Sequence, residues 1–388
     1  MKSWPKYAGA VLLLGWSLIG CSDAVSVCEA GPLTADCVAE LSVTVTVDGV
    51  PTAGIDVMVS GASTAMATTD ATGVATFSNL VAGVYTASVD DPSVIWDAAT
   101  AVVTLAEGGS GTASFTGSRL VERIVFVSTR DGNREVYSML TDGSDTQRLT
   151  NDGGQDRAPS WSPDGQQIAF HSDRAGSFDI WIMNADGTSA SRLTTNPSSR
   201  FAGWSPGPRI TFESDHNGNL DIYMINTNGS EQRQITTASQ RDGAPKWSPQ
   251  GDSITFQSDR TGSLEIFKIS NQGGTAIQLT DTGVRDITPA WSPDGSQIAF
   301  ASERDGVGTR EIYVMNADGS SPTRLTTDNA VSVSPTWSPD GTRLVYQSDR
   351  DGDFEIFIIE VSSGTIQQVT SNTIDDTEPH WGPPLPVN

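Results

Sequence analysis

Histidine, cysteine and positive charge are scarce in this chain of 388 residues. It has three histidines and three cysteines, and its 23 lysine and arginine residues stand against 47 aspartate and glutamate residues, for a net charge of −24. Nucleic acids and anionic lipid surfaces are bound through basic faces, so this charge argues against both as partners. We interpret the acidity as a contribution to solubility.

The chain also has little uninterrupted apolar sequence, and its N-terminal run from Ala8 to Ile19 is shorter than the roughly 20 residues that span a bilayer. Lys2 and Lys6 precede this run, as in a secretory signal of residues 1–20. The ending Leu-Ile-Gly-Cys resembles the lipobox of bacterial lipoproteins, which implies that Cys21 is acylated and becomes the new N-terminus. An ordinary signal peptide with an incidental cysteine is the alternative.

Two further expectations concern the segment that follows. Ser22 stands where an aspartate would resemble an inner-membrane retention signal, which favours an outer-membrane address. Cys28 and Cys37 lie in a linker of residues 21–39 with eight residues between them. In an oxidising compartment we expect them to form a disulfide, and a zinc site is disfavoured because no further cysteine or histidine is near.

A tryptophan recurs through the C-terminal two-thirds of the chain with spacings of 43, 43, 44, 46 and 44 residues. The six are Trp161, Trp204, Trp247, Trp291, Trp337 and Trp381. Each unit contains apolar, aromatic-rich runs separated by Ser-Pro-Asp-Gly and Asn-x-Asp-Gly turns, for which proline and glycine supply the φ angles. Four short antiparallel strands in a unit of 40 to 45 residues predict the blade of a β-propeller.

The two ends of the repeat region predict how the propeller closes. The first unit begins at Ile124 and lacks its tryptophan, because the residue nine before Phe126 is Gly117. The missing strand stands at the other end, as Glu378 to Trp381. We therefore expect this C-terminal strand to complete the first blade, giving an all-β, six-bladed propeller over residues 118–388 with no free sheet edge in the ring.

Residues 40–117 show a different β-pattern, which predicts a small β-sandwich. We expect strands at 41–47, 54–60, 74–77, 84–89, 101–105 and 112–115. The stretch from Thr69 to Phe77, followed by Leu80, Gly83 and Tyr85, resembles the carboxypeptidase-regulatory-like and related immunoglobulin-like modules of bacterial surface proteins. That resemblance implies a spacer or adhesive role.

The strings Pro-x-Trp-Ser-Pro-Asp-Gly, Ile-Ala-Phe-x-Ser-Asp-Arg, Ile-Tyr-x-Met-Asn-x-Asp-Gly and Arg-Leu-Thr resemble the TolB-type propeller repeat over residues 119–381. The resemblance implies a six-bladed platform, which in TolB itself is the periplasmic partner of a peptidoglycan-associated lipoprotein. Related repeats form the propellers of prolyl-oligopeptidase-like enzymes and oligogalacturonate lyases. The front domain of this chain departs from that of TolB, so a role in the Tol-Pal system does not follow directly.

The enzyme alternatives are tested by residue type. A prolyl-oligopeptidase-like enzyme needs a Gly-x-Ser-x-Gly elbow in an α/β-hydrolase domain, for which the residues after Trp381 leave no room. A lyase needs a histidine-rich metal site, whereas His171, His216 and His380 occupy three different repeat positions. The alternating carboxylates of residues 349–355 lack the EF-hand pattern of calcium loops. We therefore expect no catalytic residue, no metal and no cofactor.

The loops after the second and fourth strands share one face, which is the default binding surface because its loops are longer and more variable. The candidate partner-binding residues there are Arg130, Arg174, His216, Arg260, Arg304, Arg310, Arg350, Asp156, Asp242, Asp286 and Asp376. Because most recur in nearly every blade, they fit better as staples between neighbouring blades. The unequal features, residues 304–310 and the irregular blade with Phe201, Gly203 and His216, are the stronger binding candidates.

Two functions remain open from the sequence. The leading hypothesis is a non-catalytic, monomeric, lipid-anchored envelope protein, in which the sandwich spaces the propeller from the membrane and the loop face holds a protein or glycan partner. The alternative is a carbohydrate-active, polysaccharide lyase-like enzyme that uses the propeller channel and depends on His171.

Overall fold

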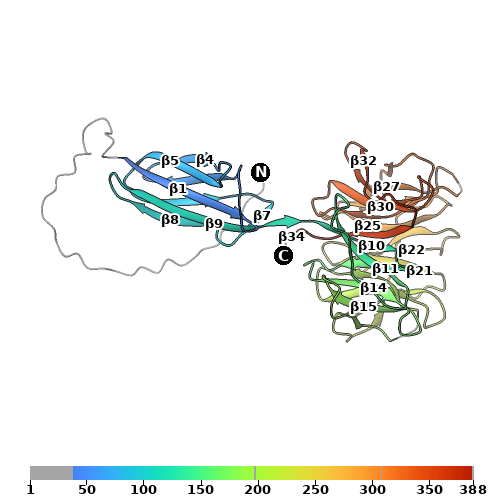
Figure 1. Ribbon diagram of the computed structural model, residues 1–388. Coiled ribbons are helices and arrows are strands. Elements are labelled where there is room, and N and C mark those ends of the chain that lie inside the picture. The colour runs from blue at the N-terminus through green and yellow to red at the C-terminus, as the bar shows by residue number, and fades with distance from the viewer. Residues whose placement is uncertain (1–37, 196–197, 307, 387–388) are drawn as a thin grey trace. The chain divides into compact units, whose positions relative to one another are not determined.

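The computed structural model describes residues 38–195, 198–306 and 308–386, and its regular secondary structure is entirely β (Figure 1). No helix in these ranges is long and apolar enough to cross a membrane. Cys21, Cys28, Cys37 and the expected signal segment lie outside the described residues. The contacts divide the chain into two compact units, with the boundary between Ser118 and Arg119.

The N-terminal unit consists of two sheets. In the first sheet, β1 (Val38–Val47) lies between β5 (Val74–Val81) and β9 (Ser110–Val121). The short β2 (Val50–Pro51) also pairs with β1, and β7 (Val94–Trp96) pairs with β9. The second sheet has the order β4 (Ala65–Thr68), β3 (Asp56–Gly61), β6 (Gly83–Val89) and β8 (Thr100–Leu105). The short β2, β4 and β7 were not among the expected strands, because runs of two to four residues carry too little alternation to be recognised.

One apolar core fills the space between these two sheets. Burial alternates along β1, where Leu41, Val43 and Val45 are buried against Val57 and Tyr85 of the second sheet. Such period-two burial is what a half-buried strand requires. The relationship of this unit to carboxypeptidase-regulatory-like modules stays a prediction.

The second unit contains six four-stranded sheets, numbered here as blades along the chain. Blade 1 is β33 (Asp376–Trp381), β10 (Arg123–Ser128), β11 (Glu135–Leu140) and β12 (Gln147–Arg148); blade 2 is β13 (Asp156–Trp161), β14 (Gln167–Ser172), β15 (Asp179–Asn184) and β16 (Ser191–Arg192); blade 3 is β17 (Arg200–Trp204), β18 (Arg209–Ser214), β19 (Asp221–Asn226) and β20 (Arg233–Gln234). Blade 4 is β21 (Asp242–Trp247), β22 (Ser253–Ser258), β23 (Glu265–Ser270) and β24 (Ile277–Gln278); blade 5 is β25 (Asp286–Trp291), β26 (Gln297–Ser302), β27 (Glu311–Asn316) and β28 (Thr323–Arg324); blade 6 is β29 (Ser332–Trp337), β30 (Arg343–Ser348), β31 (Glu355–Glu360) and β32 (Ile366–Gln368).

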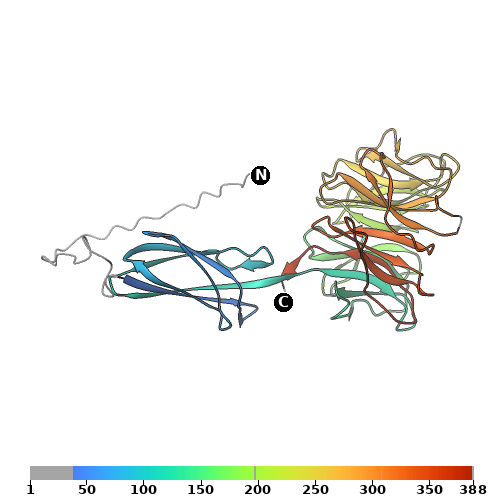
Figure 2. The same cartoon turned by 90° about the horizontal axis from the view of Figure 1, so that it is seen from above.

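The C-terminal strand closes the ring as predicted. β33 pairs antiparallel with β10, with Trp381 opposite Ile124 and Asp376 opposite Ser128. The innermost strands contact one another in succession from β13 to β33, and β33 contacts β13. The predicted all-β, six-bladed propeller is therefore confirmed. A further strand, β34 (Leu385–Pro386), pairs with Val121 and Leu120 at the end of β9 (Figure 2).

Aromatic side chains fill the space within and between blades. The aromatic residue of each second strand is fully buried, and in five blades its ring lies 5.7–5.9 Å from that of the third strand, as for Phe256 and Phe267. The repeat tryptophans pack against the preceding blade: Trp161 shares a cluster with Val125 and Val136 of blade 1. Aromatic burial therefore explains why these repeat positions hardly vary.

Every innermost strand carries a bulge at an equivalent position. Its residue adopts φ between 46° and 57° although none of the six is glycine, and the pairing register shifts there. The six residues are Ala158, Phe201, Ala244, Thr288, Ser334 and Glu378. A bulge leaves a backbone N–H outside the sheet ladder, and a buried N–H needs an acceptor.

In all six blades that acceptor is a side chain of the preceding blade. The bonds, called bulge staples below, are Ala158 N–H to Glu378 Oε2 (2.6 Å), Phe201 N–H to His171 Nδ1 (3.4 Å), Ala244 N–H to Glu213 Oε2 (2.9 Å), Thr288 N–H to Gln257 Oε1 (3.1 Å), Ser334 N–H to Thr288 Oγ1 (3.3 Å) and Glu378 N–H to Gln347 Oε1 (2.5 Å). Where the second strand has Val127 or Ala301 in place of a polar residue, the bulge residue of the preceding blade supplies the acceptor. Adjacent blades are thus joined by polar contacts to the backbone, and between blades 1 and 2 the staple acceptor Glu378 also forms a salt bridge with Arg157 at 2.7 Å.

Replacing the staple acceptor Gln347 with leucine tests this role. The Q347L variant leaves the Glu378 N–H without an acceptor, and an unsatisfied buried donor costs about 1–3 kcal/mol. We expect the free energy of unfolding to fall by that amount in chemical denaturation. The exposed Gln367 provides the matched control, because Q367L makes the same change on β32 and should shift stability by less than about 0.5 kcal/mol. Equal effects of the two variants would contradict the staple.

Glu213 predicts a pH dependence of stability. Burial raises the pKa of Glu213 from its ordinary value of 4.5 to about 7, so the folded state binds a proton that the unfolded state has released between these pH values. The stability that this proton provides is present below pH 4.5 and is lost as pH rises through 7. The E213Q variant keeps an acceptor for the Ala244 N–H and should match the parent at low pH. Above pH 7 it should be more stable by on the order of 3 kcal/mol in urea titrations.

The exposed Glu231 supplies the control for this pH experiment. E231Q should follow the parent curve at every pH. A constant difference between the E213Q and parent proteins across pH 4 to 8 would contradict the assignment.

Candidate functional site

The candidate partner-binding residues lie on one face of the propeller, where second strands end and first strands begin. Antiparallel pairing places these ends opposite each other: Ser172 pairs with Asp156, and Ser258 with Asp242. The loop face predicted from the repeat therefore exists. The structure also shows how most of its charged residues are used.

Each arginine of the Ser-Asp-Arg position stacks on the aromatic rings of its own blade. The Arg260 guanidinium carbon lies 5.2 Å and 4.8 Å from the ring centroids of Phe256 and Phe267, and its Nε–H donates to Ser258 Oγ at 2.9 Å. Arg130, Arg174, Arg304 and Arg350 are held in the same way. In blade 3, His216 takes this place, with its ring 4.6 Å from that of Tyr223.

The four candidate aspartates are fully buried partners of these arginines. The pairs Arg130–Asp376, Arg174–Asp156, Arg260–Asp242 and Arg304–Asp286 have N–O distances of 2.6–2.9 Å. Each pair joins the first and second strands of one sheet. The expectation that these pairs staple neighbouring blades is therefore wrong, because the register places both residues in the same blade. The aspartates position the arginines and are not themselves on the surface.

A second charged layer, not recognised from the sequence, begins each third strand. Its buried acids are Glu135, Asp179, Asp221, Glu265, Glu311 and Glu355. In blade 4, Thr280 Oγ1 donates to Glu265 Oε2 at 2.7 Å and accepts the Ile266 N–H at 2.9 Å. The recurrence of an acid two residues before the third-strand aromatic, with a threonine closing each unit, is the signal that could have revealed this layer.

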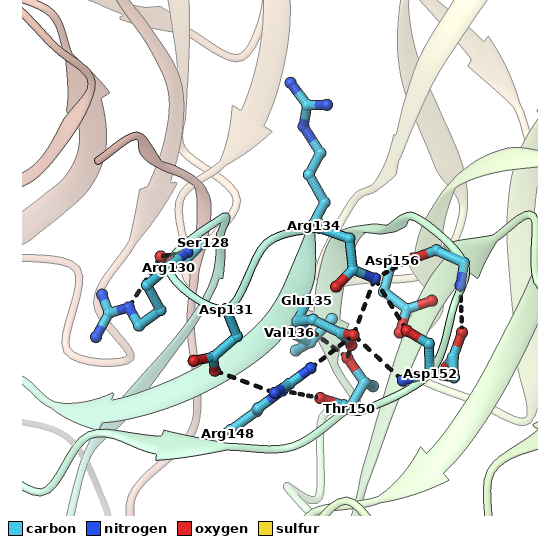
Figure 3. A network of polar contacts seen from close by, with 12 residues as sticks. Ser128, Arg130, Asp131, Arg134, Glu135, Val136, Arg148, Thr150, Asp152 and Asp156 are labelled. Carbon is cyan, nitrogen blue, oxygen red and sulfur yellow. Dashed lines mark hydrogen bonds and ion pairs between the residues drawn. The ribbon is translucent and has the colours of Figure 1, made fainter.

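At the seam between blades 1 and 2 these layers meet. In the described part of the chain, Glu135, Asp152 and Asp156 form the one group whose potential metal-ligand atoms all lie within 4.8 Å of one another. Figure 3 shows Arg148 beside Glu135, which it bonds at 2.9 Å. Arg174 bonds Asp152 and Asp156, each at 2.6 Å. All three carboxylates are thus already paired with guanidinium groups, and a dication would have to compete with them.

The three histidines do not come together. His171 is buried between Phe178 and Phe201, with ring centroids 5.2 Å and 5.4 Å away, and accepts the staple hydrogen bond. Burial, followed by the charges of Arg157 and Arg200, holds its pKa well below the ordinary value of 6.5. His171 is therefore a neutral acceptor within the blade packing and does not offer a base to a substrate.

Of the other expected features, Arg310 donates to Glu303 at 2.9 Å, so both ends of the 304–310 insertion are tied to their own blade. In the alternating acids of residues 349–355, Asp349 accepts the Val331 N–H and Glu355 accepts the Asn372 N–H. Asp349 and Glu355 therefore accept hydrogen bonds from two different loops and do not form a common site.

The central channel contains a site that the sequence reasoning missed. A cavity of about 370 Å³ is lined by all six repeat tryptophans, by prolines of the Ser-Pro turns and by the residue that precedes each tryptophan. Those six preceding residues, called the channel ring below, are Ser160, Gly203, Lys246, Ala290, Thr336 and His380. A smaller hollow of about 70 Å³ adjoins the ring and is lined by the bulge residues. The sequence contains a signal for this ring, because the residue before each repeat tryptophan differs between blades whereas the tryptophan does not.

His380 and Lys246 are the titratable groups of the channel ring. Burial, and then the charge of Lys246, lower the pKa of His380 to about 3. Burial also lowers the pKa of Lys246, to about 8. At neutral pH the ring therefore presents a neutral imidazole and one ammonium group.

Comparison with known proteins agrees with the architecture. The family described as TolB beta propeller domain matches residues 95–207, 198–288 and 283–384. A 46-residue stretch is 44% identical to the Tol-Pal system protein TolB of Desulfosudis oleivorans, covering 12% of this chain and 10% of that relative. The chain thus aligns with only a tenth of that relative's length.

Two solved structures share the fold. TolB from Acinetobacter baumannii has a TM-score of 0.60 at 21% identity, covering 67% of this chain and 66% of that one. A putative TolB from Agrobacterium tumefaciens has a TM-score of 0.54 at 22% identity, covering 69% of this chain and 99% of that one. At these identities the likeness establishes the fold alone. Since the family matches together span most of the chain, and the ring closes as that family's repeat implies, the chain belongs to the TolB beta propeller domain family.

Proposed function

We propose that this chain is a non-catalytic, lipid-anchored protein of the bacterial cell envelope, and that its propeller holds a protein or glycan partner on the loop face. The observation that carries the proposal is the use of the repeated charges. Because the Arg–Asp pairs are engaged within single blades, specific recognition falls to the residues that differ between blades.

Two unequal features of the loop face remain available to a partner. Gly306 and Gly308 are exposed in the insertion between β26 and β27, which is two residues longer than its counterparts, whereas Asp305 there pairs with Tyr313 and Arg324. Phe201 is 37% exposed at a bulge position where the other blades have alanine, threonine, serine or glutamate. Exposed aromatic residues on a polar surface commonly anchor partners.

The remaining parts of the proposal rest on the N-terminal sequence. Acylation of Cys21 would anchor the chain to a membrane, and Ser22 favours the outer membrane. An oxidising envelope would allow a Cys28–Cys37 disulfide in the linker. The two-sheet unit then serves as the spacer before a monomeric propeller. A place in the cell envelope is supported by the likeness to a Tol-Pal system protein TolB.

The lyase-like alternative depends on His171, and the surroundings of this residue count against it. His171 is 2% exposed and accepts the Phe201 N–H, so it faces the blade interior. The binding function is therefore the better supported of the two.

Exchanging one loop tests partner binding on this face. Replacing residues 305–310 with Thr-Gly-Ser-Leu, the sequence at 261–264, gives blade 5 the shorter loop of blade 4 while keeping Arg304 and its pair. We expect the partner recovered from envelope extracts by the parent protein to be reduced at least tenfold, because the unequal contacts are gone.

The control exchanges 261–264 for the equally long 351–354 segment of blade 6, which alters a loop outside the insertion and should leave recovery unchanged. Equal recovery with both exchanges would remove the insertion from the partner site.

Replacing Cys21 with alanine tests the anchor. The acyl chains stabilise membrane association by about 0.8 kcal/mol per buried methylene, so C21A should move the protein from the membrane fraction to the soluble fraction. The measurement is membrane fractionation with detergent phase partitioning. The C28A variant is the control and should stay with the membranes, whereas membrane retention of C21A would contradict lipidation.

A further inference from the structure

The channel ring is a position at which the six blades differ in chemistry. The flanking proline and tryptophan repeat almost unchanged, while the ring holds serine, glycine, lysine, alanine, threonine and histidine. Strict packing requirements would favour similar residues at equivalent positions. The ring instead places its one positively charged residue, Lys246, between the two small residues Gly203 and Ala290.

Lys246 has no counter-charge. Within the described ranges of the chain its ammonium group makes no hydrogen bond or ion pair, although it lies at the junction of the two channel hollows. The shift in its pKa arises from burial alone, without an acidic neighbour. Lys246 is half-buried, so its ammonium group is only partly hydrated, and an anion in the channel would supply the partner that it lacks.

The hydroxyl groups of the ring also have unused protons. Trp161 N–H donates to His380 Nδ1 at 3.4 Å, which places the proton of the neutral imidazole on Nε2 and directs it to Ser160 Oγ at 3.3 Å. Trp381 N–H donates to Thr336 Oγ1 at 3.2 Å. Ser160 and Thr336 thus both accept from the protein, and their own O–H groups are left to donate. With Lys246, the ring offers donors and one positive charge.

The channel walls set the remaining requirements on a ligand. Tryptophan and proline side chains line the cavity of about 370 Å³, a size typical of small-molecule sites. Indole and pyrrolidine surfaces suit a planar or apolar ring body. One ammonium group balances one negative charge, and a dianion would carry excess charge into a protein of net charge −24.

We propose that the propeller channel binds a small organic monocarboxylate, with its carboxylate on Lys246 and the hydroxyls of Ser160 and Thr336, and its ring body against the tryptophans. Phe201 lines the hollow beside Lys246, but the insertion at residues 304–310 does not line the channel, so the channel site and a partner on the insertion can hold independently.

Titration calorimetry on the full chain tests the proposal with matched probes. Benzoate is compared with benzamide, glucuronate with glucose, and inorganic phosphate serves as the inorganic-anion probe. We expect the carboxylate of at least one pair to bind at least tenfold more tightly than its neutral counterpart and than phosphate. The two pairs distinguish an aromatic body from a sugar body.

Variants assign the binding to Lys246. K246M keeps the length of the side chain without its charge and should weaken carboxylate binding at least tenfold, whereas K246R should retain it. Lys268 donates to Ala317 O outside the channel, so K268M makes the same substitution elsewhere and should bind as the parent does. Thermal melting of K246M checks its folding, and removing an unpaired, half-buried charge should not lower the melting temperature.

Three results would overturn the proposal: no binding of any carboxylate probe by the parent protein, equal binding of phosphate, or carboxylate binding that K246M leaves intact. Failure of the loop exchange to affect partner recovery would leave the channel site standing, because that exchange alters a different surface.

Discussion

The propeller depends on six backbone N–H groups that its own bulges remove from the sheets. Each innermost strand places a non-glycine residue at positive φ, and the N–H there can be satisfied only from the preceding blade. The acceptors differ chemically, from the imidazole of His171 to the amide of Gln347, yet each lies where the bulge requires it. Burial of the repeat tryptophans against the preceding blade brings the blades together, and the bulge staples fix the position of each blade relative to the next.

The pairing of the repeated charges also explains which charged residues can act on other molecules. The repeated arginines and buried acids neutralise each other inside single blades, where low local dielectric makes their pairing strong and their separation costly. The repeated charges of this chain are therefore structural, and the candidates for function are the departures from the repeat that serve no staple. Two such departures are the insertion at 304–310 on the loop face and the channel ring with Lys246.

Much of the architecture was predictable because it rests on local patterns. The tryptophan period, the turn sequences and the missing first strand before Ile124 lead to six blades and to closure by β33, all of which the structure bears out. The four-residue strand β4 and the two-residue strand β2 escaped recognition, since so few residues carry no periodic signal. The candidate face was placed correctly, but its aspartates proved to be buried.

The sequence by itself determined the fold class, the number of blades and the order of strands, because these follow from periodic burial and turn chemistry that each unit carries within itself. Only the tertiary structure decided which side chains meet. Asp376 reaches Arg130 inside one blade, His171 serves a neighbouring backbone, and Lys246 stands in the channel without a counter-charge. The physical reason is that such contacts depend on strand register and on the rotation between blades, and both are set by packing across the whole ring.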